Sequence, residues 1–454
     1  MNELPLNWAW ARVGDLVDFG PKNYYVEETE AGFVPLQHLG VNYRSRHTFE
    51  VRSWGAIKKG YTHFADGDVL LARITPSFEN GKAGIVRGLP NGIGAGSTEY
   101  FVCRPIPGVV LPEYLLAHFK TPQFLRDGEQ VMSGAVGQQR VPKQYLLDSQ
   151  LPLAPLNEQK RIADKLDAIV ARVNACRERL ERIPAILKRF RQAVLTAATS
   201  GKLTDEWRTE HELNDNWVTC NIQSVARIGT GSTPLRSNSS FYSSSGIPWI
   251  TSAATAKPIV KSAEEFVTSA AITAHRLKMY PVGTLLVAMY GEGKTRGQVT
   301  ELGIAATINQ ACAAIVVDET RANKNFVKLA LQANYMEMRE LAEGGNQPNL
   351  NLSKIKEFPL YLPSLDEQAE IVRRVEALFA YADRLDARYA AARARVEKLT
   401  PALLAKAFRG ELVPQDPNDE PASVLLERIK LMRTKNEAKP KRGRNKANHA
   451  AAGN

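Results

Sequence analysis

The segment Ala288–Thr295 carries residue types that could hold a nucleotide phosphate. Its sequence, Ala-Met-Tyr-Gly-Glu-Gly-Lys-Thr, follows an apolar run and ends in the Gly-Lys-Thr of a phosphate-binding loop, in which backbone N–H groups and a lysine cradle the phosphates. However, Ala288 stands where the first glycine is required, and the next residues (Arg-Gly-Gln-Val-Thr) predict a loop and a strand instead of the required helix. A P-loop NTPase is therefore kept only as an alternative.

Other catalytic or metal-binding patterns do not form a site in the sequence. Gly229–Thr233 is too short for a dinucleotide fingerprint and predicts a loop that crosses phosphates. The seven histidines and four cysteines have no metal-ligand spacing, and the Asn/Asp-Pro-Pro-aromatic motif of amino-methyltransferases is absent from the sequence. We therefore expect that the chain catalyses nothing by itself and holds neither a metal nor a cofactor.

The composition is typical of a soluble protein with several domains. The 454 residues are 44% hydrophobic and 24% charged, and no run approaches the roughly 18 apolar residues of a membrane span. With no signal-peptide pattern and four scattered cysteines, we expect a cytoplasmic protein with buried, reduced thiols. Residues 430–446 hold eight Lys/Arg and one Glu, a large part of the net charge of +11. We expect this basic tail to be partly disordered and to attract phosphates nonspecifically.

Two long amphipathic helices, 209 residues apart in the sequence, are the elements that must position the loops. Apolar residues recur at alternating steps of four and three in both stretches. This is the a/d pattern of a coiled coil, so we expect the helices to pair with each other, although two ordinary core helices remain an alternative. The predicted seam comprises Ile162, Leu166, Ile169, Val173, Leu180, Leu187, Phe190, Ile371, Val375, Leu378, Leu385, Val396, Leu399 and Leu403, and the pattern also includes Cys176 and Val194.

The two helices share their start and end signals. Each begins at a Leu-Asx-Glu-Gln segment, where Asn157 and Asp366 are the expected N-caps. Gly201 and Gly410 suit the position after each helix, where φ is usually positive, and an internal proline in each copy predicts a kink or a restart. Two related halves favour a pseudo-two-fold arrangement with antiparallel helices. The segment after Gly410 should then return to the first globule.

A region of about 150 residues, which would be an average domain, precedes each helix, and the two regions match loosely. Gly67–Ala72 and Gly283–Ala288 both predict a short buried strand after a turn. Further matched strands are predicted at Gly32–Leu36 and Gly246–Ile250, at Phe101–Cys103 and Ala314–Val317, and at Gln150–Leu153 and Phe358–Tyr361. Both regions therefore predict mixed α/β (α+β) globules. A shared scaffold with divergent loops is what two readers of different targets would have.

The sequence resembles the DNA-specificity subunits of type I restriction–modification systems, and is most similar to the enterobacterial K-type branch. The resemblance runs from about Trp8 to Pro414 and is most specific in residues 155–162, 186–195 and 365–368. It implies two target recognition domains that each read one half of a split DNA site, joined by a helical spacer on which two methyltransferase subunits dock. It also implies two ATP-dependent restriction subunits. S-adenosylmethionine, ATP and Mg would be bound by these partners.

The resemblance makes polar loop residues the candidates for DNA contact. Arg and Lys can bridge guanine O6 and N7, whereas Asn and Gln can bridge adenine N6 and N7. In the first globule the candidates are Lys22, Arg44, Arg46, Arg73, Lys82, Gln138, Gln139 and Arg140. In the second globule they are Arg236, Asn238, Tyr290, Lys294, Arg296, Asn346 and Gln347. Each of these residues is otherwise an ordinary solvated side chain.

We predict five segments along the chain. They are a first recognition domain (1–155), a first helical spacer (156–206), a second recognition domain (207–363), a second spacer (364–414) and a basic C-terminal tail (415–454). The expected function is that of a non-catalytic DNA-reading subunit. A scaffold whose globules bind other proteins is the alternative from a different class.

Overall fold

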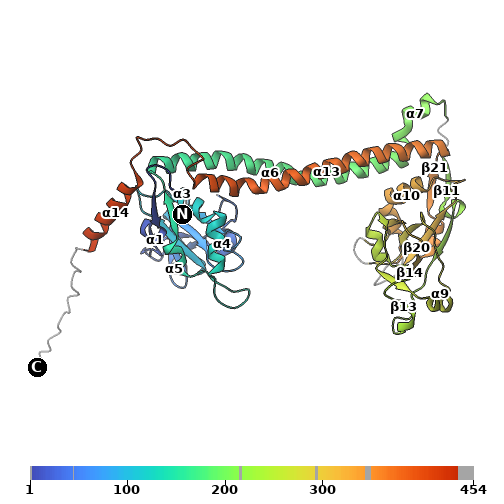
Figure 1. Ribbon diagram of the computed structural model, residues 1–454, viewed down its shortest axis with the longest axis horizontal. Coiled ribbons are helices and arrows are strands. Elements are labelled where there is room, and N and C mark those ends of the chain that lie inside the picture. The colour runs from blue at the N-terminus through green and yellow to red at the C-terminus, as the bar shows by residue number, and fades with distance from the viewer. Residues whose placement is uncertain (1–2, 44, 214–216, 292–294, 343–348, 438–454) are drawn as a thin grey trace, which may run out of the picture. The chain divides into compact units, whose positions relative to one another are not determined.

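The computed structural model describes residues 3–43, 45–213, 217–291, 295–342 and 349–437, with side chains up to residue 431 (Figure 1). Contacts divide the chain into two compact units, one formed by Met1–Glu181 with Ala391–Asn454 and the other by Arg182–Ala390. Both units are mixed α+β, as predicted, and the long helices α6 (Leu156–Thr199) and α13 (Leu365–Ala407) each contribute to both. Arg44, Lys294, Asn346, Gln347 and segment 438–454 lie outside the described residues.

The globule of the first unit is built on two four-stranded sheets and a two-stranded ribbon. The sheets have the orders β2-β9-β6-β7 and β4-β3-β8-β5, and the ribbon pairs β1 with β10. The strands are β1 (Ala9–Arg12), β2 (Val17–Phe19), β3 (Glu30–Val34), β4 (Glu50–Ser53), β5 (Thr62–Ala65), β6 (Val69–Ala72), β7 (Ala83–Ile85), β8 (Ile93–Gly96), β9 (Tyr100–Pro105) and β10 (Gln150–Leu153). The helices are α1 (Val13–Leu16), α2 (Trp54–Ile57), α3 (Pro112–Phe119), α4 (Pro122–Gln130) and α5 (Lys143–Asp148).

The globule of the second unit repeats this plan. Its sheets have the orders β12-β20-β17-β18-β15 and β13-β16-β14-β19, and its ribbon pairs β11 with β21. The strands are β11 (Val218–Asn221), β12 (Ala226–Thr230), β13 (Tyr242–Ser243), β14 (Ile247–Ile250), β15 (Ile259–Val260), β16 (Glu265–Val267), β17 (Leu285–Ala288), β18 (Val299–Leu302), β19 (Thr307–Ile308), β20 (Cys312–Val317) and β21 (Pro359–Leu362). The helices are α7 (Asp205–Glu210), α8 (Ile222–Val225), α9 (Ser269–His275), α10 (Lys324–Ala333), α11 (Tyr335–Glu340) and α12 (Leu352–Lys356).

Strand pairing confirms that the globules are copies of one scaffold. In each globule one fully buried strand, β6 or β17, lies between two antiparallel neighbours. In each, another strand has one parallel and one antiparallel neighbour: β3 between β8 and β4, and β14 between β19 and β16. Each predicted strand pair is found. An apolar run of about four residues bounded by turns suits β6 and β17, which are buried at every position.

The ends of the long helices differ slightly from the prediction. Helix α13 begins at Leu365, so the N-cap is Ser364, whose Oγ accepts a hydrogen bond from Glu367 N at 3.2 Å. Asp366 and the equivalent Asn157 lie inside the first turn, so their prediction as N-caps is wrong. Both helices continue past their internal prolines. Gly201 and Gly410 have the predicted positive φ, 77° and 72°.

Within each unit the start of one long helix packs beside the end of the other. In the first unit, Ile162 and Leu166 of α6 share a core with Leu404 of α13. In the second unit, Ile371 and Val375 of α13 share a core with Val194 of α6. The helices therefore run antiparallel in each unit, as expected.

The seam prediction is wrong at Leu399 and at Cys176, whose side chains are exposed. Leu399 is 44% exposed, whereas Leu404 is 2% exposed. Five residues turn a helix by about 140° at 3.6 residues per turn, so these two side chains cannot face the same core. Cys176 is also exposed, which corrects the expectation that all four thiols are buried; Cys220 is half-buried, and Cys103 and Cys312 are buried.

The repeated Glu-Gln pair anchors the start of each long helix to the globule before it. Gln159 accepts a hydrogen bond from Leu111 N (3.0 Å) and donates to the carbonyls of Val109 (3.0 Å) and Ala154 (2.9 Å). Gln368 accepts from Asn323 N (2.7 Å) and donates to the carbonyl of Pro363 (2.9 Å). Both glutamines are buried, so each copy of the motif satisfies backbone groups that water does not reach.

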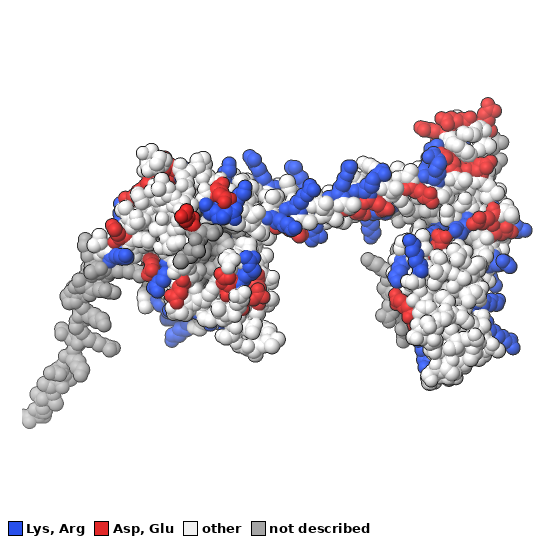
Figure 2. Space-filling view, in the orientation of Figure 1, with Lys and Arg blue, Asp and Glu red and all other residues white. Residues whose placement is uncertain are grey.

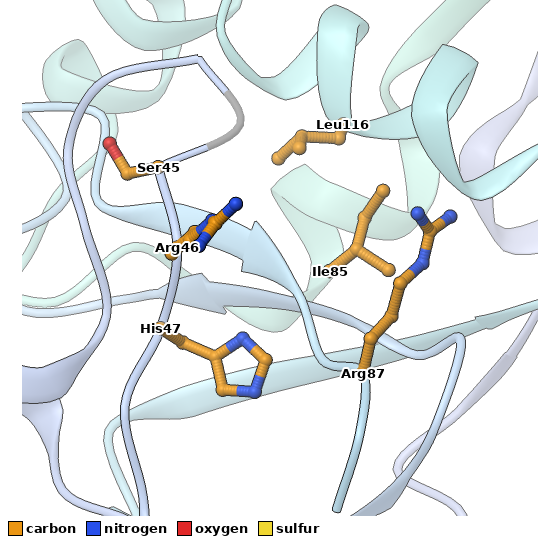
Figure 3. A pocket seen from close by; sticks show the side chains of 6 residues that line it. All are labelled: Ser45, Arg46, His47, Ile85, Arg87 and Leu116. Carbon is orange, nitrogen blue, oxygen red and sulfur yellow. The ribbon is translucent and has the colours of Figure 1, made fainter.

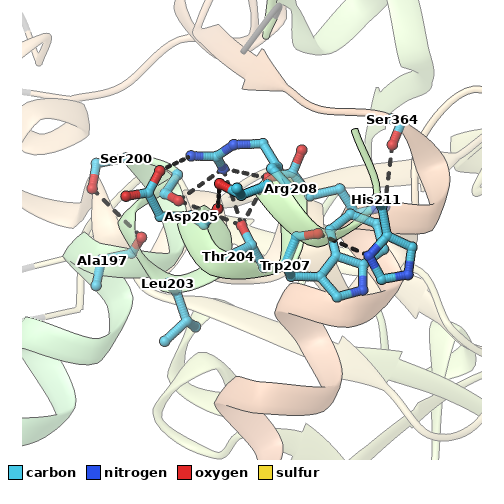
Figure 4. A network of polar contacts seen from close by, with 12 residues as sticks. Ala197, Ser200, Leu203, Thr204, Asp205, Trp207, Arg208, His211 and Ser364 are labelled. Atoms are coloured by element: carbon cyan, nitrogen blue, oxygen red, sulfur yellow. Dashed lines mark hydrogen bonds and ion pairs between the residues drawn. The ribbon is translucent and has the colours of Figure 1, made fainter. Parts of the chain in front are cut away.

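The glutamates of the motif hold different partners in the two units. Glu158 accepts from Trp8 Nε1 at 2.9 Å, and its pKa is raised mainly by burial. Glu367 accepts from Thr204 Oγ1 (2.7 Å) and from Arg208 Nη1 (2.6 Å). Arg208 also donates to the carbonyl of Gly201, so the network ties the end of α6 to the start of α13 (Figure 4). Both glutamates are buried, so each acts mainly as a buried polar contact.

We expect Gln368→Ala to lower the free energy of unfolding of the second unit by about 2–3 kcal/mol, because the change removes both bonds of a buried amide. Asp366→Ala, on an exposed side chain of the same turn, is the matched control and should cost less than about 1 kcal/mol. Urea unfolding followed by amide hydrogen exchange in β17 and β20 measures both. Equal losses in the two variants would contradict the anchoring role.

The segment after Gly410 returns to the first globule, as predicted. Ala422 N donates to the carbonyl of Asn7 at 2.8 Å, and Arg161 Nη2 lies 2.6 Å from Asp419 Oδ2. Helix α14 (Ala422–Glu437) buries Ala422, Leu425 and Ile429 in the core of the first unit. The region from residue 415, predicted as a tail, therefore contains a packed helix that we did not predict. The finer domain boundaries stay predictions.

Candidate nucleic-acid interface

Two loops of the first globule bring predicted contact residues together. The loop after β6 and the loop after α4 are joined by the bond from Val141 N to the carbonyl of Arg73 (2.8 Å) and by the bond from Thr75 N to the carbonyl of Gln139 (3.0 Å). Residues 74 and 140 also form an isolated bridge. These bonds place Arg73, Gln139 and Arg140 at one end of the sheet, beside the start of β9.

Glu99, which we did not predict, organises the arginines of this loop pair. Arg140 donates through Nη2 (2.7 Å) and Nε (3.0 Å) to the Glu99 carboxylate, which raises the pKa of Arg140. Arg73 Nε lies 4.0 Å from the same carboxylate, and its guanidinium lies over the Phe101 ring at 5.0 Å. A guanidinium held by one carboxylate keeps donors free for a base edge or a phosphate. Glu99 therefore fixes two cations in place.

The second globule has the equivalent loop pair with different side chains. Leu350 N donates to the carbonyl of Met289 at 3.0 Å, as Val141 N does to Arg73. Tyr290 follows this anchor and is 37% exposed. The carbonyl of Arg296, which lies in the same loop, accepts from Arg339 Nη1 at 3.1 Å. The structure thus retains the anchor between the loops and changes the residues that the loops carry.

Arg236, a predicted contact in the second globule, is held by two aromatic rings and a carboxylate. Its guanidinium lies 4.8 Å from the Tyr242 ring centroid and 4.9 Å from that of Trp249. Its Nη2 donates to Glu265 Oε1 at 3.1 Å, and this carboxylate raises the pKa of Arg236. Aromatic contact and a carboxylate together orient an exposed planar cation that can read a base or bind a phosphate.

Other predicted residues are partly used by the fold. Lys82 Nζ donates to the carbonyl of Leu36 at 3.1 Å, which ties its ammonium to the chain. Asn238 accepts from Ser240 N (3.1 Å) and Oγ (2.7 Å), so its side-chain oxygen caps a local turn. Lys22 and Gln138 are exposed. All four stay predictions as DNA contacts.

Arg46 lies in a separate cationic pocket of the first unit. This pocket has a volume of about 380 Å³ and is lined by Arg46, His47, Arg87, Ser45, Ile85 and Leu116. Figure 3 shows Arg46 and Arg87 reaching into the same hollow. Arg87 is paired with Glu113, and burial lowers the pKa of His47. The pocket is separate from the Arg73–Arg140 loop pair and gives the globule a second place for an anion.

Within the described residues, three features that other functions would need do not occur. After Thr295 the chain forms a turn and then β18, so the helix required after a phosphate-binding loop is absent from this described part. Among the described residues there is no group of three or more His, Cys, Asp and Glu placed to hold a metal ion. In the same residues, every helix is too short or too polar to span a bilayer.

Basic side chains also line the long helices (Figure 2). From residue 172 to residue 191, α6 carries seven Lys/Arg (172, 177, 179, 182, 188, 189 and 191) and two Glu (178 and 181). Arg191 Nη2 is neutralised by Asp383 and Asp386 of α13, each at 2.7 Å. Most of the other cations are exposed and can attract a polyanion.

Comparison with known families adds a sequence match over most of the chain. The family model described as the type I restriction modification DNA specificity domain matches twice, at residues 5–185 and 214–389. The EcoKI specificity subunit of Escherichia coli K12 is 32% identical over 356 residues, which cover 72% of this chain and 74% of that protein. The Escherichia coli EcoAI specificity subunit is 39% identical over 217 residues, but the match spans only 36% of that protein's length.

Solved structures show the same fold at lower sequence identity. The HsdS subunit from Thermoanaerobacter tengcongensis aligns with a TM-score of 0.65 at 20% identity, over 90% of this chain and 98% of that one. A chain from a structure concerned with complex assembly and conformational transition of the type I R-M system aligns with a TM-score of 0.71 at 20% identity, over 90% of this chain and all of that one.

Proposed function

The chain belongs to the family of type I restriction–modification DNA specificity subunits, and from this premise we propose that it selects the DNA target of such a complex. Each globule reads one half of a split site through its loops. In this proposal the chain supplies no catalytic residues, and its partners carry out methylation and cleavage. S-adenosylmethionine, ATP and Mg belong to those partners.

One observation supports this proposal most directly: the same loop anchor occurs in both globules and carries different side chains. The bond to the carbonyl of Arg73 and the bond to the carbonyl of Met289 hold equivalent loops. Arg140 with Glu99 occupies the first loop pair, whereas Tyr290 and Arg296 come from the second. A shared backbone anchor with different contact residues is expected of two globules that recognise different DNA sequences, and not of two copies of one binding site.

The partners follow from the two units. Because each unit repeats the same junction of globule and long helices, we propose that two methyltransferase subunits dock on the chain, one per unit, and that two restriction subunits join this core. The long helices act as the spacer between the readers. The alternative, a scaffold whose globules bind only proteins, lacks an explanation for the carboxylate-held guanidinium groups of Arg140 and Arg236.

We expect Arg140→Ala to relax recognition in one half of the site and Arg296→Ala to relax it in the other half. Each lost base contact should cost about 1–3 kcal/mol of discrimination. Binding selections with the assembled methyltransferase complex, against duplex libraries randomised in one half at a time, measure the effect. Arg126→Ala is the control and should leave both halves unchanged, because Arg126 is an exposed residue of α4 whose Nη2 donates to Gln123 of the same helix. A variant that changes preference in both halves would contradict one globule per half-site.

A further inference from the structure

A groove in the second unit joins α6 to the recognition globule. It has a volume of about 800 Å³ and is walled by Lys188 and Gln192 of α6 on one side. Tyr335 and Arg339 of α11, with Lys257, form the other walls. The groove thus brings side chains of the long helix and of the globule to one surface.

The charge of this groove has one sign. It is lined by Lys188, Lys257 and Arg339, and none of its lining residues is an Asp or a Glu. Lys188 is exposed and makes no ion pair with any described residue. Lys257 Nζ lies 3.2 Å from Glu264 Oε1, but both side chains are mostly exposed (53% and 84%). A surface pair of this kind is weak, so much of the attraction of Lys257 for an anion remains.

Arg339 connects the groove to the candidate interface. Its Nη1 donates to the carbonyl of Arg296 (3.1 Å) and to Tyr335 Oη (2.9 Å), and its guanidinium lies 5.4 Å from the Tyr335 ring centroid. These contacts fix the guanidinium beside the loop that carries Arg296. A DNA duplex that reaches this loop therefore has the groove next to it.

The first unit has a groove at the same place in the repeat, with a different charge. It is smaller, about 220 Å³, and Glu397 stands where the second groove has Lys188, 209 residues earlier. Lys120 lines it too, but its ammonium is buried and donates to the carbonyls of Val41 (2.8 Å) and Gly81 (2.5 Å). Glu397 Oε1 accepts a hydrogen bond from Arg393 Nε at 3.0 Å, and Arg177 Nη1 donates to Asn174 Oδ1 at 3.0 Å. Of these two grooves, only the second has lining cations without a lining carboxylate.

We propose that the groove of the second unit binds the phosphate backbone of DNA, with Lys188 of the long helix as a phosphate contact beside Lys257 and Arg339. The inference rests on the proposed function and adds a sequence-independent contact to it. A polyanion complements three cations and no carboxylate, and phosphate contacts fix the position of a protein on a duplex without reading its sequence. The equivalent groove of the first unit does not make this contact.

The test compares two adjacent cations of α6 in the assembled methyltransferase complex. Lys188→Ala should weaken binding of a labelled random-sequence duplex and of a target duplex by the same factor. It should also reduce the slope of log K against log salt by about 0.9, the value for one phosphate contact. Arg189→Ala, which is exposed and points about 100° away around the helix, should leave the slope unchanged. Lys188→Arg should restore it.

The possible results separate the inference from the proposed function. Equal slopes for Lys188→Ala and Arg189→Ala, with specific binding intact, would overturn the groove contact alone. A loss of assembly with the methyltransferase subunits, with normal DNA affinity in the complex that still forms, would assign the groove to a protein partner and also overturn it. A wild-type complex that prefers no duplex sequence would contradict the proposed function itself.

Discussion

Leu166→Asp should unfold the first unit or lower its free energy of unfolding by at least about 4 kcal/mol, because it buries a carboxylate in an apolar core. Leu166 is fully buried between the globule and the long helices, in the core that also holds Ile162 and Leu404. The charged side chain has no room to reach water from that position. Loss of this core would also release the start of α6 from the globule.

Leu399→Asp is the matched control, because the sequence pattern assigns both leucines to the same seam. Leu399 is 44% exposed in the same unit, so an aspartate there can stay solvated and should cost less than about 1 kcal/mol. Amide hydrogen exchange in β6 and β9 reports the first unit, and exchange in β17 and β20 reports the second. The expected result is a large loss of protection in the first unit for Leu166→Asp alone. Similar losses for both variants would mean that the seam is buried as the pattern suggested.

The difference between these two leucines shows what the sequence could predict of the fold. Because the chain repeats itself at a fixed offset, the two copies together revealed the two long helices and four matched strands in each globule. Periodicity reveals that a helix has an apolar stripe, but it does not show where the stripe meets a globule. At the end of α13 the core is built around Leu404 and Ala407, so Leu399 is turned away from it. Which of these side chains is buried depends on packing between segments that are far apart in the sequence.

The sequence predicted which loops carry the candidate site, but it did not predict the contacts that hold the side chains in place. Arg73 was a candidate because it follows an apolar strand, and Arg140 because it lies in a polar loop that leads to the last predicted strand. Glu99, which holds Arg140, lies 41 residues earlier in the sequence, and no local pattern connects the two. Trp249 of β14 and Glu265 of β16 orient Arg236, and strand β15 lies between them in the sequence. A carboxylate at the start of a strand can have many roles, so only the fold shows which carboxylate positions an arginine.

Insertion of one heptad into each long helix should lengthen the gap between the two half-sites that the complex recognises. The insertions belong after Glu181 and after Ala390, where each helix passes from one compact unit to the other. These two points are also equivalent in the repeat, since they are 209 residues apart. If each insert duplicates the seven residues before it, the spacing of apolar positions is kept and both cores are left untouched.

Seven residues add about 10 Å of helix at 1.5 Å per residue, and DNA rises about 3.4 Å per base pair. If the helices act as the ruler, the unspecified spacer should therefore grow by up to about three base pairs, while both half-sites stay the same. Three base pairs also rotate one half-site by roughly 100°, because a turn takes about 10.5 base pairs. Reduced methylation is therefore expected, and the decisive measurement is the spacer among the sites that remain methylated in a genome-wide modification map.

A heptad in α6 alone is the control and should disturb the helix pair without a new spacing. A map of the doubly extended protein that retains the original spacer would show that the distance between half-sites is set elsewhere, by the globules or by the partner subunits.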